Sequence, residues 1–287
     1  MTPASLEVVE PGPLTTVQDL GRPGLGSLGV SPSGAADRPS ARRANALVGN
    51  PAEAAVLEIT LGGLVLRARG DCDLALAGAS VAPTVDGAPV EGDVLVLAEG
   101  ARLRLGRPAV GVRTYLAVQG GVDVEPVLGS RSTDLLSGLG PAPLARGDVL
   151  PVGALVRSSA SVGTGTAASH DLALPLLPGP RLDWFDAQAL DRLVGSAYAV
   201  LPDSNRIALR LAGQPVVRSG GGELASEGLV RGALQVPPTG QPVLFLADHP
   251  VTGGYPVIAV VPDEATDAAA QARPGTRITF RIGWTSH

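Results

Sequence analysis

One stretch near the start of the chain groups polar side chains and glycines around a single arginine. It covers residues 15–24 and reads Thr-Thr-Val-Gln-Asp-Leu-Gly-Arg-Pro-Gly. A guanidinium can hold a carboxylate or a phosphate through two parallel hydrogen bonds, so Arg22 is a candidate anion-binding residue. In the alternative reading Gly21, Pro23 and Gly24 form a turn that leaves Arg22 on the surface.

A second polar stretch, residues 31–36, leads directly into a predicted helix. Loop amides that run into a helix N-terminus can bind an anion. Asp37 can cap this helix, or it can hold a cation or polarise an amide. Arg42 and Asn45 lie three residues apart and therefore on one helical face. Asn45 is either a site residue or a brace for a neighbouring loop.

Two further candidates lie at or near the ends of predicted strands. Glu58 is a carboxylate in an apolar run, so it either faces solvent or is buried with a partner. A buried carboxyl has a raised pKa and is an acid–base candidate. Gln119 ends another strand, and the hydroxyl-rich stretch 129–134 around Arg131 and Ser132 fits an oxyanion or phosphate cradle, or a plain surface loop.

The richest polar cluster of the second half is residues 248–256. His249 is a candidate general base near neutral pH, and Asp248 can orient it if the backbone bends suitably. Thr252 and Tyr255 add hydroxyl groups. The alternative is a tight turn whose polar groups satisfy their own backbone.

Composition excludes several classes of function. The 287 residues carry a net charge of −5, which argues against a nucleic-acid binder. The chain has no lysine, so it can form no Schiff base, build no P-loop and carry no biotin. The acids beside Cys72, the single cysteine, raise a thiol pKa, so a structural role is expected. With three histidines we expect no metal site.

Location follows from what the sequence contains. No apolar run is long enough to span a membrane, and the first residues do not resemble a signal peptide. A single cysteine allows no intrachain disulfide, which fits a reducing compartment. We therefore expect a cytoplasmic protein.

Short apolar runs separated by glycine and proline predict a mainly β protein of antiparallel barrels or sandwiches. Helices are predicted within 37–50, over 186–194 and over 263–272. The first has Asp37 as cap, Pro39 in its first turn, and Gly49 and Pro51 at its end.

The two halves of the chain carry similar motifs in the same order. The pairs are 11–19 with 178–183, 76–78 with 211–213, 115–121 with 245–254, and 145–153 with 272–283. This order indicates an internal duplication. We expect domains at 1–160 and 170–287, with the helix at 37–50 as an insertion in the first. The Ser/Gly/Thr-rich stretch 157–175 is the predicted connection.

Taken together, these motifs resemble the allophanate hydrolase subunit 2 (KipA) family, which includes one of the subunits of 5-oxoprolinase. The resemblance is carried by 12–22, Gly34-Ala35-Ala36-Asp37 with Asn45 and 49–50, Leu57-Glu58, 118–121, 129–133, 235–242 and 252–256. It covers nearly the whole chain in the same order.

The resemblance implies two cyclophilin-like β-barrels and a subunit that is inactive alone. Its expected partners are a KipI-like subunit and a LamB/YcsF-like subunit, with which it opens 5-oxoproline to glutamate. ATP with Mg is expected in the complex, where it would activate the lactam carbonyl, and developing negative charge would need arginine and amide donors. Expected catalytic residues are Arg22, Asp37, Asn45 and Glu58, and expected binding residues are Gln119, Arg131, Ser132, Thr252 and Tyr255.

Two other functions remain open at this stage. Similar sequences form the carboxyltransferase part of biotin-dependent urea carboxylase, and here any biotin would have to sit on another chain. The other possibility is a non-catalytic regulator that antagonises a KipI-like kinase inhibitor. Members of the family often have another residue where His249 stands, which weakens its candidacy as a base.

Overall fold

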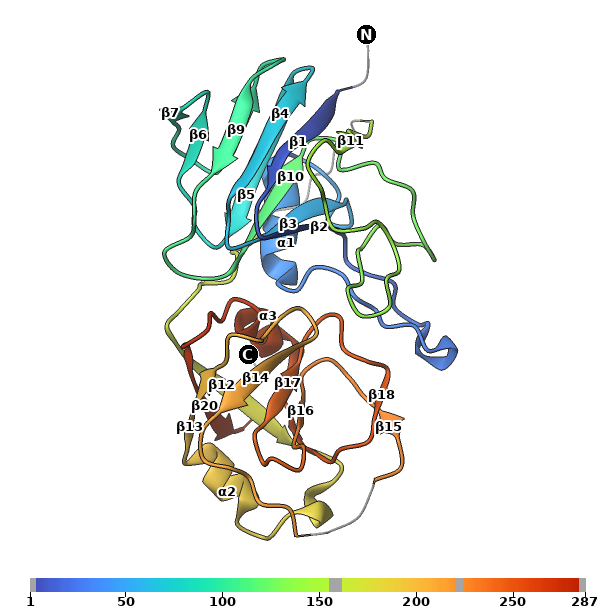
Figure 1. The fold of residues 1–287 in the computed structure, drawn as a ribbon, viewed down its shortest axis with the longest axis vertical. Helices are drawn as coiled ribbons and strands as arrows, with labels where there is room; N and C mark the ends of the chain where they lie inside the picture. Colours follow the sequence, from blue (N-terminus) through green and yellow to red (C-terminus); the bar gives the residue numbers. More distant parts are fainter. Residues whose placement is uncertain (1–3, 155–161, 220–223, 284–287) are drawn as a thin grey trace. The chain divides into compact units, whose positions relative to one another are not determined.

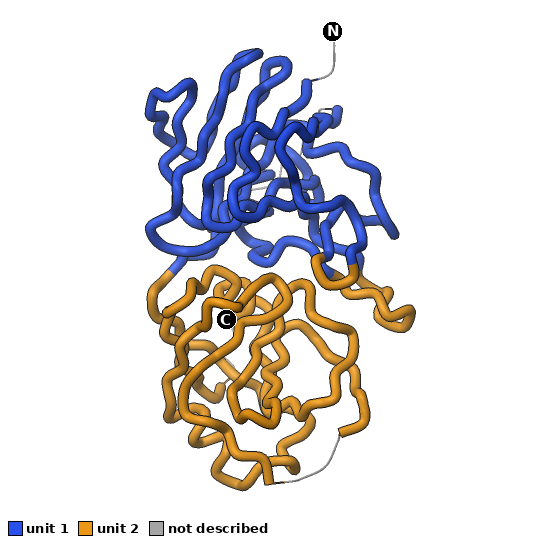
Figure 2. The backbone as a smooth tube through the Cα atoms, viewed as in Figure 1, with its two compact units in different colours: residues 1–22, 33–134, 138–168 blue, residues 23–32, 135–137, 169–287 orange. Residues whose placement is uncertain are grey.

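The computed structural model describes residues 4–154, 162–219 and 224–283, and the chain divides into two compact units (Figure 2). Unit 1 comprises residues 1–22, 33–134 and 138–168, and unit 2 comprises 23–32, 135–137 and 169–287. Both units are built mainly from strands (Figure 1). The predicted mainly β fold is therefore confirmed.

Unit 1 contains two sheets around one apolar core. The first has the order β11 (Val149–Pro151), β1 (Ser5–Pro11), β4 (Leu64–Arg69), β9 (Arg102–Leu105), β6 (Pro83–Val85), β7 (Ala88–Pro89). The second has the order β2 (Leu14–Gln18), β3 (Val56–Thr60), β10 (Arg113–Val118), β5 (Cys72–Gly78), β8 (Val94–Leu97). Leucine and valine side chains of both sheets fill the space between them.

The second sheet is covered on both faces, because successive side chains of a strand point to opposite sides. Leu57 and Ile59 of β3 join the core between the sheets. Val56 lies in a separate cluster with alanines of helix α1 (Arg38–Leu47). Glu58 is two residues from Val56 and therefore faces the same side as α1. This alternation buries a carboxylate between a sheet and a helix.

Helix α1 begins and ends where local rules predict. The carboxylate of Asp37 accepts from the Ser40 amide at 3.1 Å and from the Ser40 hydroxyl at 2.7 Å. Pro39 stands in the first turn, where its missing N–H costs no hydrogen bond. Gly49 follows the helix at φ +73°, a conformation that favours glycine. The helix predicted within 37–50 is confirmed.

Unit 2 is a closed barrel around its own core. Its strand order is β12 (Asp171–Pro178), β19 (Val257–Val260), β16 (Ala233–Gln235), β17 (Val243–Phe245), β14 (Ala208–Ala212), β13 (Ala197–Val200), β20 (Arg277–Ile282). A separate two-stranded sheet joins β15 (Glu227–Gly228) to β18 (Thr252–Gly253). Short 3-10 turns occur at Gly26–Leu28 and Leu182–Trp184.

The two helices of unit 2 are shorter than predicted. Helix α2 covers Ala189–Val194, and α3 covers Asp263–Ala269. The α2 helix begins late because the Asp186 carboxylate accepts from the Gln188 amide and holds a turn there. Among the described residues, no helix has the length and apolar character needed to cross a membrane.

Candidate functional site

A buried carboxylate, a tyrosine and the start of helix α1 form one hydrogen-bonded group in unit 1. Tyr115 and Glu58 are direct cross-strand partners in β10 and β3. The Tyr115 hydroxyl donates to Glu58 Oε2 at 2.7 Å and accepts from the Asp37 amide at 2.7 Å. The Ala36 amide also donates to Glu58 Oε2, and Arg113 Nε lies 3.3 Å from Glu58 Oε1. Of the two readings of Glu58, the buried one with partners is confirmed.

The tyrosine of this group remains neutral. Burial, together with the carboxylates of Glu58 and Asp37, raises the pKa of Tyr115 well above its ordinary value. Tyr115 therefore acts as a fixed donor to Glu58. The Asp37 carboxylate is occupied by Ser40 and by the Thr166 hydroxyl at 2.6 Å, as expected for a helix cap.

Asp19 gathers the loop 130–132 onto the end of strand β2. Its carboxylate accepts from the Ser130 hydroxyl at 2.6 Å and from the Ser132 hydroxyl at 2.5 Å. It also accepts from the amides of Arg131 at 2.6 Å and Gly21 at 2.7 Å. Sequence alone did not reveal this role of Asp19, because the loop residues that it binds lie more than 100 positions away. The only local signal is the adjacent polar pair Gln18-Asp19.

Arg22 is buried beside this junction, with an exposed fraction of 2 %. Its Nη2 donates to the Ser132 carbonyl at 2.5 Å and its Nε to the Val127 carbonyl at 3.4 Å. Its Nη1 has no hydrogen-bond partner among the described residues. Gly140 stands against it at φ +80°, where an added Cβ would lie 2.1 Å from the Ser132 carbonyl oxygen. The surface-turn reading of Arg22 is therefore wrong.

Two neutral side chains next to Arg22 also have unused atoms. Gln18 Nε2 donates to the Thr16 hydroxyl at 3.0 Å and to the Thr133 carbonyl at 2.9 Å, while Gln18 Oε1 accepts from no described residue. The Thr133 hydroxyl likewise has no described partner. We call Gln18, Asp19, Arg22, Ser132 and Thr133 the Arg22 cluster.

The Arg22 cluster continues into the Glu58 group across the sheet. Thr16 pairs directly with Glu58 in the register of β2 and β3. Gln18 is two residues further along β2, so it points to the same face as Thr16. Of the predicted site residues, the structure thus brings Arg22 and Ser132 together and links them through this face to Glu58 and Asp37.

Asn45 and Gln119 form a separate group at the end of α1. Asn45 Nδ2 donates to the Ala54 carbonyl at 2.7 Å, and Asn45 Oδ1 accepts from Asn50 at 3.0 Å. Gln119 Nε2 donates to the Val48 carbonyl at 3.1 Å. The contacts of Asn45 are those of a brace that fixes the loop after the helix.

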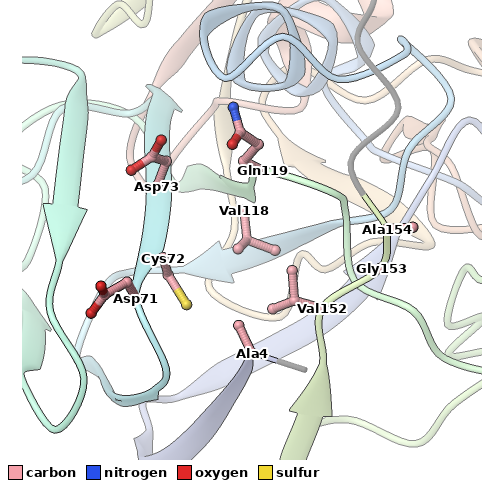
Figure 3. Close-up of a pocket in the computed structure, with 9 residues that line it drawn as sticks. All are labelled: Ala4, Asp71, Cys72, Asp73, Val118, Gln119, Val152, Gly153 and Ala154. Atoms are coloured by element: carbon pink, nitrogen blue, oxygen red, sulfur yellow. The ribbon is translucent and has the colours of Figure 1, made fainter. Parts of the chain in front are cut away.

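Gln119 also lines a pocket of about 580 Å³ in unit 1 (Figure 3). The Cys72 sulfur points into it, toward Ala4 and Val152. Burial and then the carboxylates of Asp71 and Asp73 raise the pKa of Cys72, which disfavours a thiolate nucleophile. Neither Arg22 nor Asn45 lines this pocket.

Arg131 takes part in the cluster through its main chain only. Its side chain pairs with Asp123 at 2.8 Å and donates to the Val124 carbonyl at 2.7 Å. The side chain is about one-third exposed. Its guanidinium is therefore directed away from the Arg22 cluster.

The candidates of the second half lie in unit 2. Thr252 pairs with Gly228 in the small sheet, and Tyr255 is exposed while its carbonyl accepts from Gln235. Asp248 forms a two-bond ion pair with Arg206, both side chains being at most 1 % exposed.

The ring of His249 contacts the main chain of the next residue. Its Nδ1 lies 2.8 Å from the Pro250 carbonyl oxygen, the contact of a protonated Nδ1 that donates to a neighbouring main-chain atom. In the described parts of the chain, no three His, Cys, Asp or Glu side chains lie close enough to hold a metal ion.

Comparison with known proteins adds a family match over most of the chain. Residues 28–282 match the family model described as "Carboxyltransferase domain, subdomain A and B". A 5-oxoprolinase subunit of Escherichia coli is 42% identical over 279 residues, which are 96% of this chain and 90% of that protein. The urea amidolyase of Lachancea kluyveri is 33% identical over 97% of this chain but only 17% of its own length.

Solved structures give the same result. The crystal structure of the K. lactis urea amidolyase matches 98% of this chain with a TM-score of 0.91 and 30% identity, and this chain spans 19% of that protein. The protein TTHA0988 matches 98% of this chain with a TM-score of 0.86 and 39% identity, and this chain spans 56% of it.

Proposed function

Because this chain belongs to the carboxyltransferase domain family, subdomains A and B, we propose that it is a subunit of an ATP-dependent 5-oxoprolinase that opens 5-oxoproline to glutamate. In this proposal it works in the cytoplasm with a KipI-like and a LamB/YcsF-like subunit, and it has no activity alone. ATP with Mg enters at the level of the complex.

One observation carries the proposal. The 42% identity with the Escherichia coli 5-oxoprolinase subunit extends over nearly the full length of both proteins. In the urea amidolyases, in contrast, the match covers only 17% and 16% of the relative's length. The Escherichia coli 5-oxoprolinase subunit is the match that covers most of both sequences.

The chemistry proposed for the complex is an ATP-driven hydrolysis. The lactam carbonyl oxygen takes the γ-phosphoryl group of ATP and ADP leaves. Water then adds to the activated carbon, the ring C–N bond breaks and the nitrogen takes a proton, which leaves an acyl phosphate. A second water hydrolyses this acyl phosphate to the carboxylate and inorganic phosphate. Negative charge develops at oxygen in these steps and needs donors held in place.

The Arg22 cluster is the part of this chain best suited to such donors. Arg22 has a positive charge that no carboxylate of the described chain neutralises and a nitrogen that no described residue uses. The Ser132 carbonyl accepts from Arg22 Nη2, and Asp19 in turn accepts from the Ser132 hydroxyl. We propose Arg22 as a substrate-binding residue, with Glu58 and Asp37 acting to position the neighbouring backbone and Asn45 acting to brace the loop after α1.

The decisive experiment is reconstitution. This chain, a KipI-like subunit and a LamB/YcsF-like subunit are mixed with 5-oxoproline, ATP and Mg, and glutamate and ADP are measured. We expect equal amounts of both products, and loss of both when this chain is omitted. Turnover that persists without this chain would refute the proposal.

A second candidate function is favoured by the family match itself. The chain could be the carboxyltransferase part of a urea-processing enzyme, as the urea amidolyase relatives suggest. Since the chain has no lysine, a biotinylated partner would then be required. Bicarbonate-dependent carboxylation of urea with a biotinylated protein, and no glutamate from 5-oxoproline, would favour this function over the first.

A further inference from the structure

The Arg22 cluster contains a buried guanidinium that no carboxylate of the described chain contacts. The side chain is 2 % exposed, and its two hydrogen bonds go to neutral main-chain carbonyls. Burying a charge without an opposite charge is unfavourable, since the lost hydration is not replaced. An anionic oxygen from outside the chain, placed at the unused Nη1, would replace it.

Asp19, the acid of the Arg22 cluster, forms no hydrogen bond with Arg22. Asp19 already accepts four hydrogen bonds, two from the hydroxyls of Ser130 and Ser132 and two from the amides of Gly21 and Arg131. Three of these bonds reach Oδ1 and one reaches Oδ2, and none of them comes from the Arg22 side chain. Asp19 instead positions Ser132, whose carbonyl then orients Arg22.

The other unused atoms define what else the ligand must carry. Gln18 Nε2 donates to the Thr133 carbonyl, which can only accept, so the orientation of the Gln18 amide is fixed. Gln18 Oε1 is therefore a free acceptor, and the Thr133 hydroxyl can donate or accept. Together with Arg22 Nη1, the cluster offers one charged donor, one acceptor and one hydroxyl.

We propose that the Arg22 cluster binds a small carboxylate that also carries an amide N–H. Arg22 Nη1 donates to the carboxylate, Gln18 Oε1 accepts from the N–H, and the Thr133 hydroxyl adds a bond to the carboxylate. A five-membered lactam with a carboxylate on the carbon next to its nitrogen has both groups on adjacent ring atoms. The identification of this ligand as 5-oxoproline rests on the proposed function.

Buried water is the competing explanation. Ordered waters satisfy many buried polar atoms, and they can satisfy Gln18 Oε1 and the Thr133 hydroxyl. A water, however, brings no charge to Arg22. The ligand explanation accounts for all three atoms and for the charge, whereas the water explanation accounts for the neutral atoms alone.

The test is a binding measurement on the full chain with two probes of nearly equal shape. Isothermal calorimetry compares 5-oxoproline with 5-oxoprolinamide, in which a neutral amide replaces the carboxylate. We expect the carboxylate to bind at least tenfold more tightly. In Arg22→Gln this preference should fall to within twofold, because the charged donor is gone. The N-methyl derivative of 5-oxoproline should bind several-fold more weakly to the unaltered chain.

Arg104→Gln is the matched control, because it makes the same change at an exposed arginine of unit 1 that pairs with Glu10. It should keep the full preference for the carboxylate. If Arg22→Gln does not fold, Thr133→Val replaces it, since that hydroxyl has no described partner and its loss should weaken binding several-fold without lowering the melting temperature.

The outcomes separate this inference from the proposed function. Equal binding of the two probes, no binding of either, or an Arg22→Gln protein that keeps the preference would overturn the inference. Glutamate formation by the reconstituted complex is measured separately. A complex that turns over normally with Arg22→Gln would refute the site and leave the proposed function intact.

Discussion

Arg22 in unit 1 and Arg206 in unit 2 are both almost completely buried, and the two are used differently. Arg206 in unit 2 meets the Asp248 carboxylate through two hydrogen bonds of 2.9 and 2.8 Å. Arg22 in unit 1 meets only main-chain carbonyls, and one of its nitrogens has no described partner. Both side chains are at most 2 % exposed.

Under the proposed function, this difference separates a structural arginine from a binding arginine. A buried ion pair such as Arg206 with Asp248 uses its charge within the fold, and removing one partner leaves the other uncompensated. The charge of Arg22 has no carboxylate partner in the described chain. Such a charge destabilises the free protein, and a bound anion would stabilise it. Perturbed or uncompensated charges of this kind are concentrated at functional sites.

The largest effect should come from Arg206→Met. The substitution leaves the Asp248 carboxylate buried without its counter-charge, and breaking such a pair costs about 3–5 kcal/mol. The measurement is urea unfolding followed by circular dichroism. The double variant Arg206→Met with Asp248→Leu should recover part of the loss. A loss below about 1 kcal/mol (roughly fivefold in the folding equilibrium) would place Arg206 in the same class as Arg22 and remove the contrast.

The second-largest effect on stability is expected at a hydrogen-bonded hydroxyl beside the Arg22 cluster. Tyr115→Phe removes the hydroxyl that joins Glu58 to the Asp37 amide, and losing such a buried contact costs about 1–3 kcal/mol. Because the pKa of Tyr115 is raised, the hydroxyl is neutral through the physiological range. The cost should therefore be the same at about pH 6 and about pH 9. A loss that vanishes at the higher pH would show that the tyrosine ionises there.

Local rules and periodicity were enough to predict most of the fold. Asp37, Pro39 and Gly49 mark helix α1 through interactions within a few residues, and the short Leu and Val runs became strands. The candidate site was harder, because its contacts are distant in sequence. Tyr115 is 57 residues from Glu58, and Ser132 is 113 from Asp19.

The site predictions differ in how much of each residue's role could be inferred from its type and its neighbours in the sequence. Arg22 was predicted as an anion-binding residue by its type alone, but its burial follows from a turn near Gly140 that no local pattern reveals. Asn45 was predicted as either a site residue or a brace. Its partners are Asn50 and the Ala54 carbonyl, which are the contacts of a brace. They belong to a loop whose path the sequence does not specify. The residue type determines which bonds a side chain can form, and its tertiary contacts determine which of them it does form.

A smaller effect is expected from Arg22→Met, the counterpart of the first substitution. It removes two donors to main-chain carbonyls but leaves no buried carboxylate alone, and the Val127 carbonyl keeps its bond from the Ser130 amide. We expect a loss of about 1 kcal/mol in the same unfolding measurement. A loss as large as that of Arg206→Met would mean that the Arg22 charge is used within the fold.

The smallest effect on stability, and the most specific, should come from Thr133→Val. The two side chains are close in shape, and the Thr133 hydroxyl has no described partner, so valine removes a buried polar group that lost its water on folding. Removing such a group should leave the free energy of unfolding unchanged or raise it by up to about 1 kcal/mol.

The control for this variant is Thr114→Val, which removes a hydroxyl that donates to the Ala79 carbonyl at 2.6 Å. That loss should destabilise the protein by about 1 kcal/mol. Equal losses at both positions would show that the Thr133 hydroxyl is satisfied in the free protein. A gain at Thr133 against a loss at Thr114 would show that the Arg22 cluster gives up stability for binding capacity, which is the property that distinguishes it from the Arg206 pair.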